Sequence, residues 1–569
     1  MTKKIIALFL AVVMMAGIVA GCGKSGSNNS SGKTGTENTG TENTGTEATG
    51  TTETSDKGGD EIVVTIGSEP KTIDPTLNNA VDGATMIIHA FEGLTKLNEK
   101  GEVIAGVAEK WDMSEDGTKF TFYIRDDAKW SDGQPVTAQD FVYSWKRALD
   151  PAVGAEYAYQ LYYIKNGQAI NNGEMSVDEL GVVAKDDKTL EVTLEAPTAY
   201  FLELTAFPTL FPLREDVIEK DPEGWSTNPE TYIGNGPFVL ESWEHDSEVV
   251  FKKNPNYYAA DTILPSRIKF MLIADDNAAL AAYRNDELML ADSVPTEEIP
   301  ALKQSGDLKV DPQLGTYFYV FNVEKPPFDN VKVRKALSLA IDRQYIIDTI
   351  AQANQIPAGA FVPGGVPDVN ADPDFRTVGG DYYDPSAEAY EANIQEAQKL
   401  LAEAGYPNGE GFPQVELMYN SEGAHSTIAE AIQEMWKKNL GITVKLTGQE
   451  WKVFQDTRQN GNYQIARHGW LGDYNDPMTF LDMWTSYSGQ NEARWKNSEY
   501  DKLIEKAKVS ADRAERMEAM HKAEDIFMEE SPVIPIYYYT DTYIVKDYLK
   551  GFYNSPLGFK YFMYAYIEK

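Results

Sequence analysis

The chain has 569 residues, of which 42% are hydrophobic, and its formal net charge is −37. This length exceeds what one hydrophobic core supports, so we expect two or three domains. So acidic a chain is repelled by nucleic acid and by anionic membrane surfaces, which excludes both as binding partners. The single cysteine, Cys22, excludes disulfide bonds within the chain.

The first 60 residues have the pattern of an export signal followed by a tether. Residues 1–21 combine Lys3 and Lys4 with the apolar run IIALFLAVVMMAGIVA, as a secretory signal peptide does. The run ends in Val-Ala-Gly-Cys, which resembles a bacterial lipobox, so we expect diacylation of Cys22. Residues 22–60 are rich in Gly, Ser and Thr and nearly devoid of apolar side chains, and we expect them to be a disordered tether.

In the next part of the chain, strand and helix patterns alternate. The string EIVVTIG (61–67) alternates like a strand, and the apolar residues within 120–124 predict another. Thr137, with Asp140 three positions later, predicts the capping box of a helix that buries apolar residues up to Leu149. Further elements are expected at 189–197 (a strand), within 233–258 (two strands) and at 267–290 (a strand, then a helix).

The C-terminal half continues this alternation. The string TYFYVFNV (316–323) is aromatic and extended, and a helix is expected to follow it at 331–343. Strands that alternate with helices favour the α/β class. The remaining elements are expected at 385–405 (a helix), 414–451 (strand, helix, strand), 499–530 (a long helical stretch) and 533–547 (extended chain).

Arg467 and Asp473 stand out among the charged residues of the apolar, glycine-containing segment at 463–484. Arg467 continues one face of a period-two run, and Asp473 follows Gly469 and Gly472 among aromatic residues. The carboxylate is placed to meet a cation and the arginine to meet an anion, as the two ends of a peptide would require. The alternative is that both residues pair with charges of the protein itself, because structural ion pairs are common.

Several strings resemble one protein family, in the same order along the chain. These are KWSDGQPVTAQDFVYSW (129–145), GQEW (448–451) and GWLGDYNDP (469–477). They resemble segments of the oligopeptide-binding proteins of the OppA type, which belong to family 5 of the extracytoplasmic solute-binding proteins of bacterial ABC transporters. The resemblance extends from about residue 61 to the end of the chain.

The resemblance implies an α/β fold of the type II periplasmic-binding-protein kind. Two lobes are joined by hinge strands, with candidates at 314–320 and 533–547, and an extra third domain is inserted in the N-terminal lobe. The implied boundaries are 61–91, 208–315 and 541–569 for lobe I, 92–207 for the inserted domain II, and 316–540 for lobe III.

The resemblance also implies a peptide site. In this family, the position of Asp473 binds the peptide's α-amino group. Arg467, Arg458 and His425 match basic positions that can meet a carboxylate, and a neutral histidine would be the weaker partner. Further ligand contacts are expected from Tyr157, Trp451, Gly469, Trp470, Leu471 and Tyr539.

Two positions depart from the family pattern. A lysine position is Ala351 here, and a glutamate position is Val320. The preferred peptide length, and which of the basic residues holds the C-terminus, therefore stay open.

The chain lacks the motifs of common hydrolases. It has no HExxH and no GxSxG, and its five histidines are scattered. We expect no enzyme activity, no cofactor and no metal.

The leading hypothesis is a monomeric receptor, lipid-anchored on the extracytoplasmic face of a Gram-positive cell membrane, that delivers peptides to the permease subunits of an ABC importer. The alternatives are the same fold with an oligosaccharide or metal chelate as ligand, a peptide-pheromone sensor, and an extracellular peptide hydrolase.

Overall fold

The computed structural model describes residues 60–569, except residues 199, 371 and 511. All of these belong to one compact unit, residues 56–569. The predicted signal, Cys22 and the tether up to residue 59 lie outside the described residues, so the expectations for them stay predictions. Among the described residues, no helix combines the length and apolar character that crossing a membrane requires.

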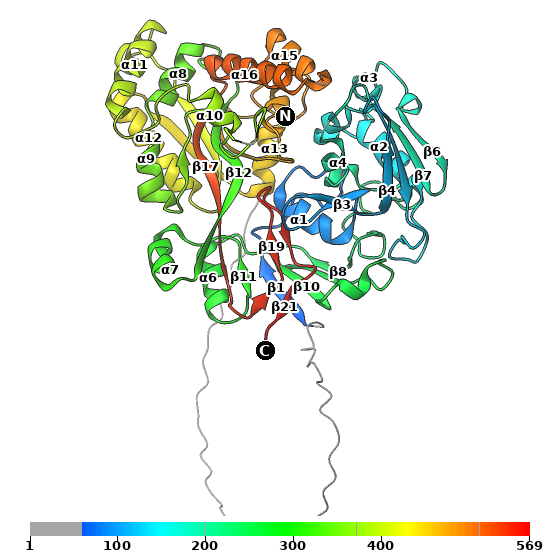
Figure 1. Ribbon diagram of the computed structural model, residues 1–569. Coiled ribbons are helices and arrows are strands. Elements are labelled where there is room, and N and C mark those ends of the chain that lie inside the picture. Colours follow the sequence, from blue (N-terminus) through cyan, green and yellow to red (C-terminus); the bar gives the residue numbers. More distant parts are fainter. Residues whose placement is uncertain (1–59, 199, 371, 511) are drawn as a thin grey trace, which may run out of the picture. The chain divides into compact units, whose positions relative to one another are not determined.

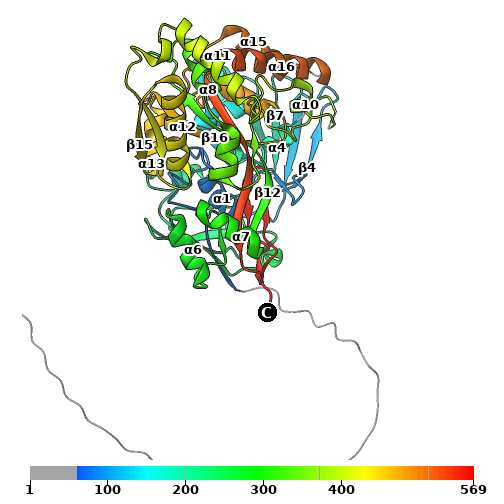
Figure 2. The same cartoon turned by 90° about the vertical axis from the view of Figure 1, so that its left-hand side faces the viewer.

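An eleven-stranded sheet organises this unit. Its strands pair in the order β15-β14-β16-β12-β17-β11-β1-β10-β9-β8, and β13 pairs with β17. In Figure 2, the edge strand β15 lies with helices α12 and α13. The strands are β1 (Glu61–Thr65), β8 (Phe238–Glu244), β9 (Glu248–Lys253), β10 (Arg267–Met271), β11 (Leu290–Ala291), β12 (Leu308–Phe321), β13 (Ile356–Pro357), β14 (Val415–Asn420), β15 (Val444–Gln449), β16 (Ile465–Leu471) and β17 (Val533–Val545).

The two long strands β12 and β17 connect the two halves of this sheet. Figure 1 shows them side by side, running from the strands around β1, β10 and β11 to the helices around α8, α12 and α16. One end of β17 pairs with β11, and the far end of β12 pairs with β16. Their register shifts between Pro312 and Thr316, where an irregularity lets a strand bend. The predicted α/β fold with two lobes and hinge strands is confirmed.

A separate four-stranded sheet has the order β4-β5-β7-β6. Its strands are β4 (Ala108–Met113), β5 (Lys119–Ile124), β6 (Val182–Asp186) and β7 (Thr189–Thr193). Helix α2 (Ala138–Leu149) accompanies it, and the predicted capping box between Thr137 and Asp140 is present. The boundaries of the domains stay a prediction. The remaining strands form the pairs β2 (Thr95–Leu97) with β3 (Val103–Ala105), β18 (Leu549–Lys550) with β21 (Tyr566–Ile567), and β19 (Tyr553–Asn554) with β20 (Lys560–Tyr561).

Two helices differ from the sequence-based expectation. The helix expected from residue 385 begins only at Tyr390, because Asp384 accepts a hydrogen bond from the backbone of Ser386 and holds a turn there. The helical stretch expected at 499–530 is two helices, and the side chain of Asp512 caps the second one.

The helices of the described chain vary widely in length. They are α1 (Val81–Ala90), α2, α3 (Gly167–Asn171), α4 (Phe201–Leu204), α5 (Glu215–Ile218), α6 (Asp276–Arg284), α7 (Ile299–Ser305), α8 (Val331–Leu339), α9 (Arg343–Tyr345), α10 (Phe375–Gly379), α11 (Tyr390–Glu403), α12 (His425–Leu440), α13 (Trp451–Gln459), α14 (Met478–Leu481), α15 (Ser498–Val509) and α16 (Arg513–Glu530).

Strand β12 is buried on both faces. Tyr317, Tyr319 and Phe321 pack into one hydrophobic cluster, with α8 and α12. The alternate residues Phe318 and Val320 pack into another. Because successive side chains of a strand point to opposite faces, one strand contributes to both cores. Strand β16, which carries Arg467, pairs with this buried strand and is therefore held in a fixed position.

Candidate functional site

A cavity of about 410 Å³ lies where the ends of β14 and β16 face α1 and the loop that follows β1. Its lining brings together side chains that are hundreds of positions apart in the sequence. Every residue that the sequence predicted as a ligand contact lines it: Tyr157, His425, Trp451, Arg458, Arg467, Gly469, Trp470, Leu471, Asp473 and Tyr539. The ligand contact expected of each residue stays a prediction.

Asp473, just after β16, is only 9% exposed. Its carboxylate accepts hydrogen bonds from the Tyr157 hydroxyl (3.2 Å) and from the Gln160 amide (2.7 Å). Burial raises the pKa of Asp473 well above its usual value, and the nearby charge of Asp482 adds to this, while the hydrogen bonds oppose it. Among the described residues, no cation pairs with Asp473. The site therefore holds a desolvated carboxylate that a positive group would stabilise.

Arg467 is half-buried in the middle of β16. It donates a hydrogen bond to the Tyr539 hydroxyl (3.0 Å), and its guanidinium lies 4.9 Å from the centre of the Tyr317 ring. Gly469 makes this arrangement possible, because a Cβ atom there would lie 2.2 Å from the Tyr539 hydroxyl. No carboxylate pairs with Arg467 in the described part of the chain. The alternative that Arg467 and Asp473 are neutralised by the protein's own charges is therefore wrong for both residues.

His425, the first residue of α12, supports the same face of the cavity. Its Nδ1 lies 3.0 Å from the Tyr317 hydroxyl, and its ring stacks on the Tyr317 ring. Burial lowers the pKa of His425 well below its usual value, and the charge of Arg467 lowers it further. At neutral pH, His425 is an uncharged hydrogen-bonding group.

Arg458, on α13, lies in the cavity wall but is already paired. Its guanidinium forms an ion pair with Glu492, and both side chains are almost fully buried. Burial alone would raise the pKa of Glu492, but Arg458 and His468 outweigh it, so the pKa lies below its usual value. The charge of Arg458 is therefore already compensated within the protein, unlike that of Arg467.

We expect Arg458→Met to lower the free energy of unfolding by about 3 kcal/mol, because removing one partner strands the buried charge of Glu492. Urea denaturation followed by circular dichroism measures the effect. Arg284→Met is the matched control, because Arg284 forms an ion pair with Glu298 but is 54% exposed. The double variant Arg458→Met with Glu492→Leu should recover part of the loss. An unchanged midpoint in the single variant would contradict this role.

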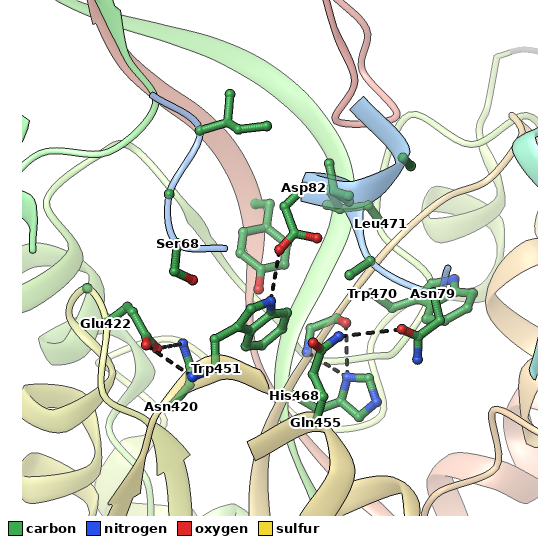
Figure 3. Close-up of a pocket in the computed structure, with 18 of the residues that line it drawn as sticks. Ser68, Asn79, Asp82, Asn420, Glu422, Trp451, Gln455, His468, Trp470 and Leu471 are labelled. Carbon is green, nitrogen blue, oxygen red and sulfur yellow. Dashed lines mark hydrogen bonds between the residues drawn. The ribbon is translucent and has the colours of Figure 1, made fainter. Parts of the chain in front are cut away.

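Helix α13 bonds across the cavity to the segment that follows β1. The Trp451 indole N–H donates to Asp82 (2.9 Å), as Figure 3 shows. The Lys71 ammonium lies 2.8 Å from an Asp456 carboxylate oxygen. These contacts link α13 to residues 71–82, which follow β1 in the chain.

Sequence reasoning missed several residues of the cavity. Gln160 binds Asp473, and Asp82, Asp276, Asn420 and Glu422 line the wall near Trp451. Only Gln160 had a local signal, since it lies three positions after Tyr157 in a tyrosine-rich segment.

The two positions that depart from the family pattern lie elsewhere. Ala351 and Val320 are buried and do not line the cavity. Within the described ranges, no cluster of His, Cys, Asp or Glu side chains could hold a metal ion.

Comparisons with known proteins agree on one family. The family described as bacterial extracellular solute-binding proteins, family 5, middle region, matches residues 102–492. The oligopeptide-binding protein OppA of Bacillus subtilis is 42% identical over 518 residues, which cover 90% of this chain and 93% of that protein. A crystal structure of Haemophilus influenzae OppA in complex with the peptide RPPGFSPFR is 36% identical, with a TM-score of 0.85 over 90% of this chain and 99% of that one.

The arrangement of the lobes distinguishes two of the similar structures. An unliganded, open form of the murein tripeptide-binding protein MppA is also 36% identical over 90% of this chain and 99% of that one, but its TM-score is only 0.60. Since identity and coverage equal those of the peptide complex, the lower score reflects a different arrangement of the lobes. The present structure is thus closer to the peptide-bound arrangement.

Proposed function

Because this chain belongs to family 5 of the bacterial extracellular solute-binding proteins, we propose that it captures oligopeptides in the cavity beside β16 for uptake by an ABC importer. The observation that carries this proposal is the pair of unneutralised charges, Asp473 and Arg467, on one wall of the cavity. A peptide has a positive terminus, a negative terminus and a polar backbone between them. An oligosaccharide without charged groups would leave both charges unpaired.

The separation between Asp473 and Arg467 suits short peptides. Asp473 and Arg467 are six positions apart, and six residues of extended chain span up to about 20 Å. The long arginine side chain can shorten that span. An extended peptide with its amine at Asp473 and its carboxylate at Arg467 would therefore have about three to six residues. His425, neutral beside Arg467, would add a hydrogen bond to the carboxylate.

The arrangement of the strands supports a closing motion of the lobes. The lobes would rotate about β12 and β17 near the irregularity at 312–316, and α13 would dock on the segment 71–82. A peptide favours the closed form only as far as it binds that form better than the open one. The closed form would then deliver the peptide to permease subunits, with the chain held at the membrane by diacylated Cys22.

Mass spectrometry of small molecules released from the purified, denatured protein tests this function. We expect peptides of three to six residues. Titration calorimetry with tri- to pentapeptides should give saturable binding, whereas oligosaccharides and metal chelates should give none. Tight binding of a sugar or chelate, with no binding of any peptide, would overturn the proposal in favour of another solute.

A further inference from the structure

Three acidic residues line the cavity outside the strand that carries Arg467. They are Asp82 in the first turn of α1, Asp276 at the start of α6 and Glu422 just after β14, and all are half-buried. Figure 3 shows the Trp451 side chain between Asp82 and Glu422. We call these three carboxylates, with Asn420, the acidic subsite.

The carboxylates of the acidic subsite have only neutral partners. Glu422 accepts from the Trp451 backbone N–H (3.1 Å), and Asp82 accepts from the Trp451 indole (2.9 Å). Asp276 accepts from the Ser293 hydroxyl (2.5 Å). Within the part of the chain that the structure describes, none of the three carboxylates forms an ion pair. Three negative charges therefore face one region of the cavity without compensation.

Asn420 lies beside Glu422 in the lining of the cavity. It is 5% exposed, and its amide nitrogen donates to Glu422 (3.0 Å). A carboxylate only accepts hydrogen bonds, so the Asn420 carbonyl oxygen must point away from Glu422. That oxygen is buried and has no partner. A buried acceptor without a donor costs free energy.

Two of the carboxylates have raised pKa values. Burial raises the pKa of Asp82 above its usual value. Burial also raises the pKa of Asp276, and nearby negative charges, Glu422 among them, add to that effect. A bound cation would stabilise the charged form of both groups.

The geometry points to the acidic subsite as the pocket for a basic side chain, lysine or arginine, of the bound peptide. Both side chains offer only donors and a positive charge, which match the three carboxylates of the subsite. This inference rests on the proposed function, because it concerns one side-chain position of a peptide that Asp473 and Arg467 hold by its ends. Trp451 would contact the aliphatic part of the same side chain.

Calorimetry with matched peptides tests this inference. Tetrapeptides of alanine would carry lysine, or norleucine, which keeps the aliphatic chain and lacks the charge, at each inner position in turn. At one of these positions, we expect the lysine peptide to bind about ten- to a hundredfold more tightly than the norleucine peptide. This factor corresponds to the free energy of a hydrogen bond to a charged group. Glu422→Gln and, separately, Asp82→Asn should bring that ratio close to one.

Asp275→Asn is the matched control, because Asp275 is an exposed neighbour of Asp276 that does not line the cavity. It should keep the lysine preference. Equal affinity for lysine and norleucine peptides in the unaltered protein would overturn the acidic subsite while leaving peptide capture intact. A lysine preference that survives both Glu422→Gln and Asp82→Asn would also overturn it. Failure of every peptide to bind, norleucine peptides included, would instead remove the proposed function itself.

Discussion

Asp473→Asn is expected to weaken the binding of tri- to pentapeptides by about a hundredfold or more. Truncating one partner of a buried, hydrogen-bonded charge pair costs about 2–5 kcal/mol, and a tenfold change in affinity corresponds to about 1.4 kcal/mol. Asparagine has nearly the same shape and can still accept from Gln160, so the loss reports the charge. Calorimetry with free and N-acetylated peptides measures it.

The free and acetylated peptides separate the two sources of that loss. Acetylation should cost the unaltered protein as much as the mutation does, and it should cost Asp473→Asn little. Asp261→Asn, an exposed residue that does not line the cavity, is the control and should bind as the unaltered protein does. Full affinity of Asp473→Asn for free peptides would show that the amine binds elsewhere.

The same residue should make binding dependent on pH. Burial raises the pKa of Asp473 well above its usual value, and a bound ammonium group would lower it again. Binding therefore releases a proton at pH values between the pKa of Asp473 in the complex and its raised pKa in the free protein, and affinity falls as the pH is lowered through this range. Binding heats measured in two buffers of different ionisation enthalpy should show this release in the unaltered protein and not in Asp473→Asn.

Arg467→Gln is expected to weaken binding of peptides with a free C-terminus by about thirtyfold or more, because a desolvated carboxylate then loses its charged donor. Peptides with an amidated C-terminus should lose much less, since they offer no negative charge. Arg467→Gln also removes the contact between the guanidinium and the Tyr317 ring, which would weaken both peptide series equally. The difference between the losses for free and for amidated peptides therefore measures the contribution of the carboxylate.

Arg284→Gln is the control for Arg467→Gln, because it makes the same chemical change at an exposed site away from the cavity. It should leave both peptide series unchanged. An equal loss for free and amidated peptides would assign Arg467 to packing against Tyr317 and leave the carboxylate to another group.

The sequence by itself determined the local elements and the family. Helix Ala138–Leu149 begins at its capping box and buries the predicted stripe, because caps and apolar periodicity act within a few residues. The resemblance of the stretch around Asp473 and Arg467 to the family's peptide-binding segment predicted it as the ligand-binding segment, whereas its residues alone left pairing with the protein's own charges open. The start of α11 was missed by five residues, because the turn at Asp384 depends on one side-chain hydrogen bond.

Only the tertiary structure decided which charges are free. The sequence alone does not tell Arg458 and Arg467 apart, since both match basic positions of the family. In the structure, Arg458 is buried against Glu492, whereas Arg467 faces the cavity and pairs with no carboxylate of the described residues. The acidic subsite gathers residues from segments that are hundreds of positions apart. Whether a charge is neutralised depends on its neighbours in space and on its exposure to water, and neither quantity is contained in local sequence patterns.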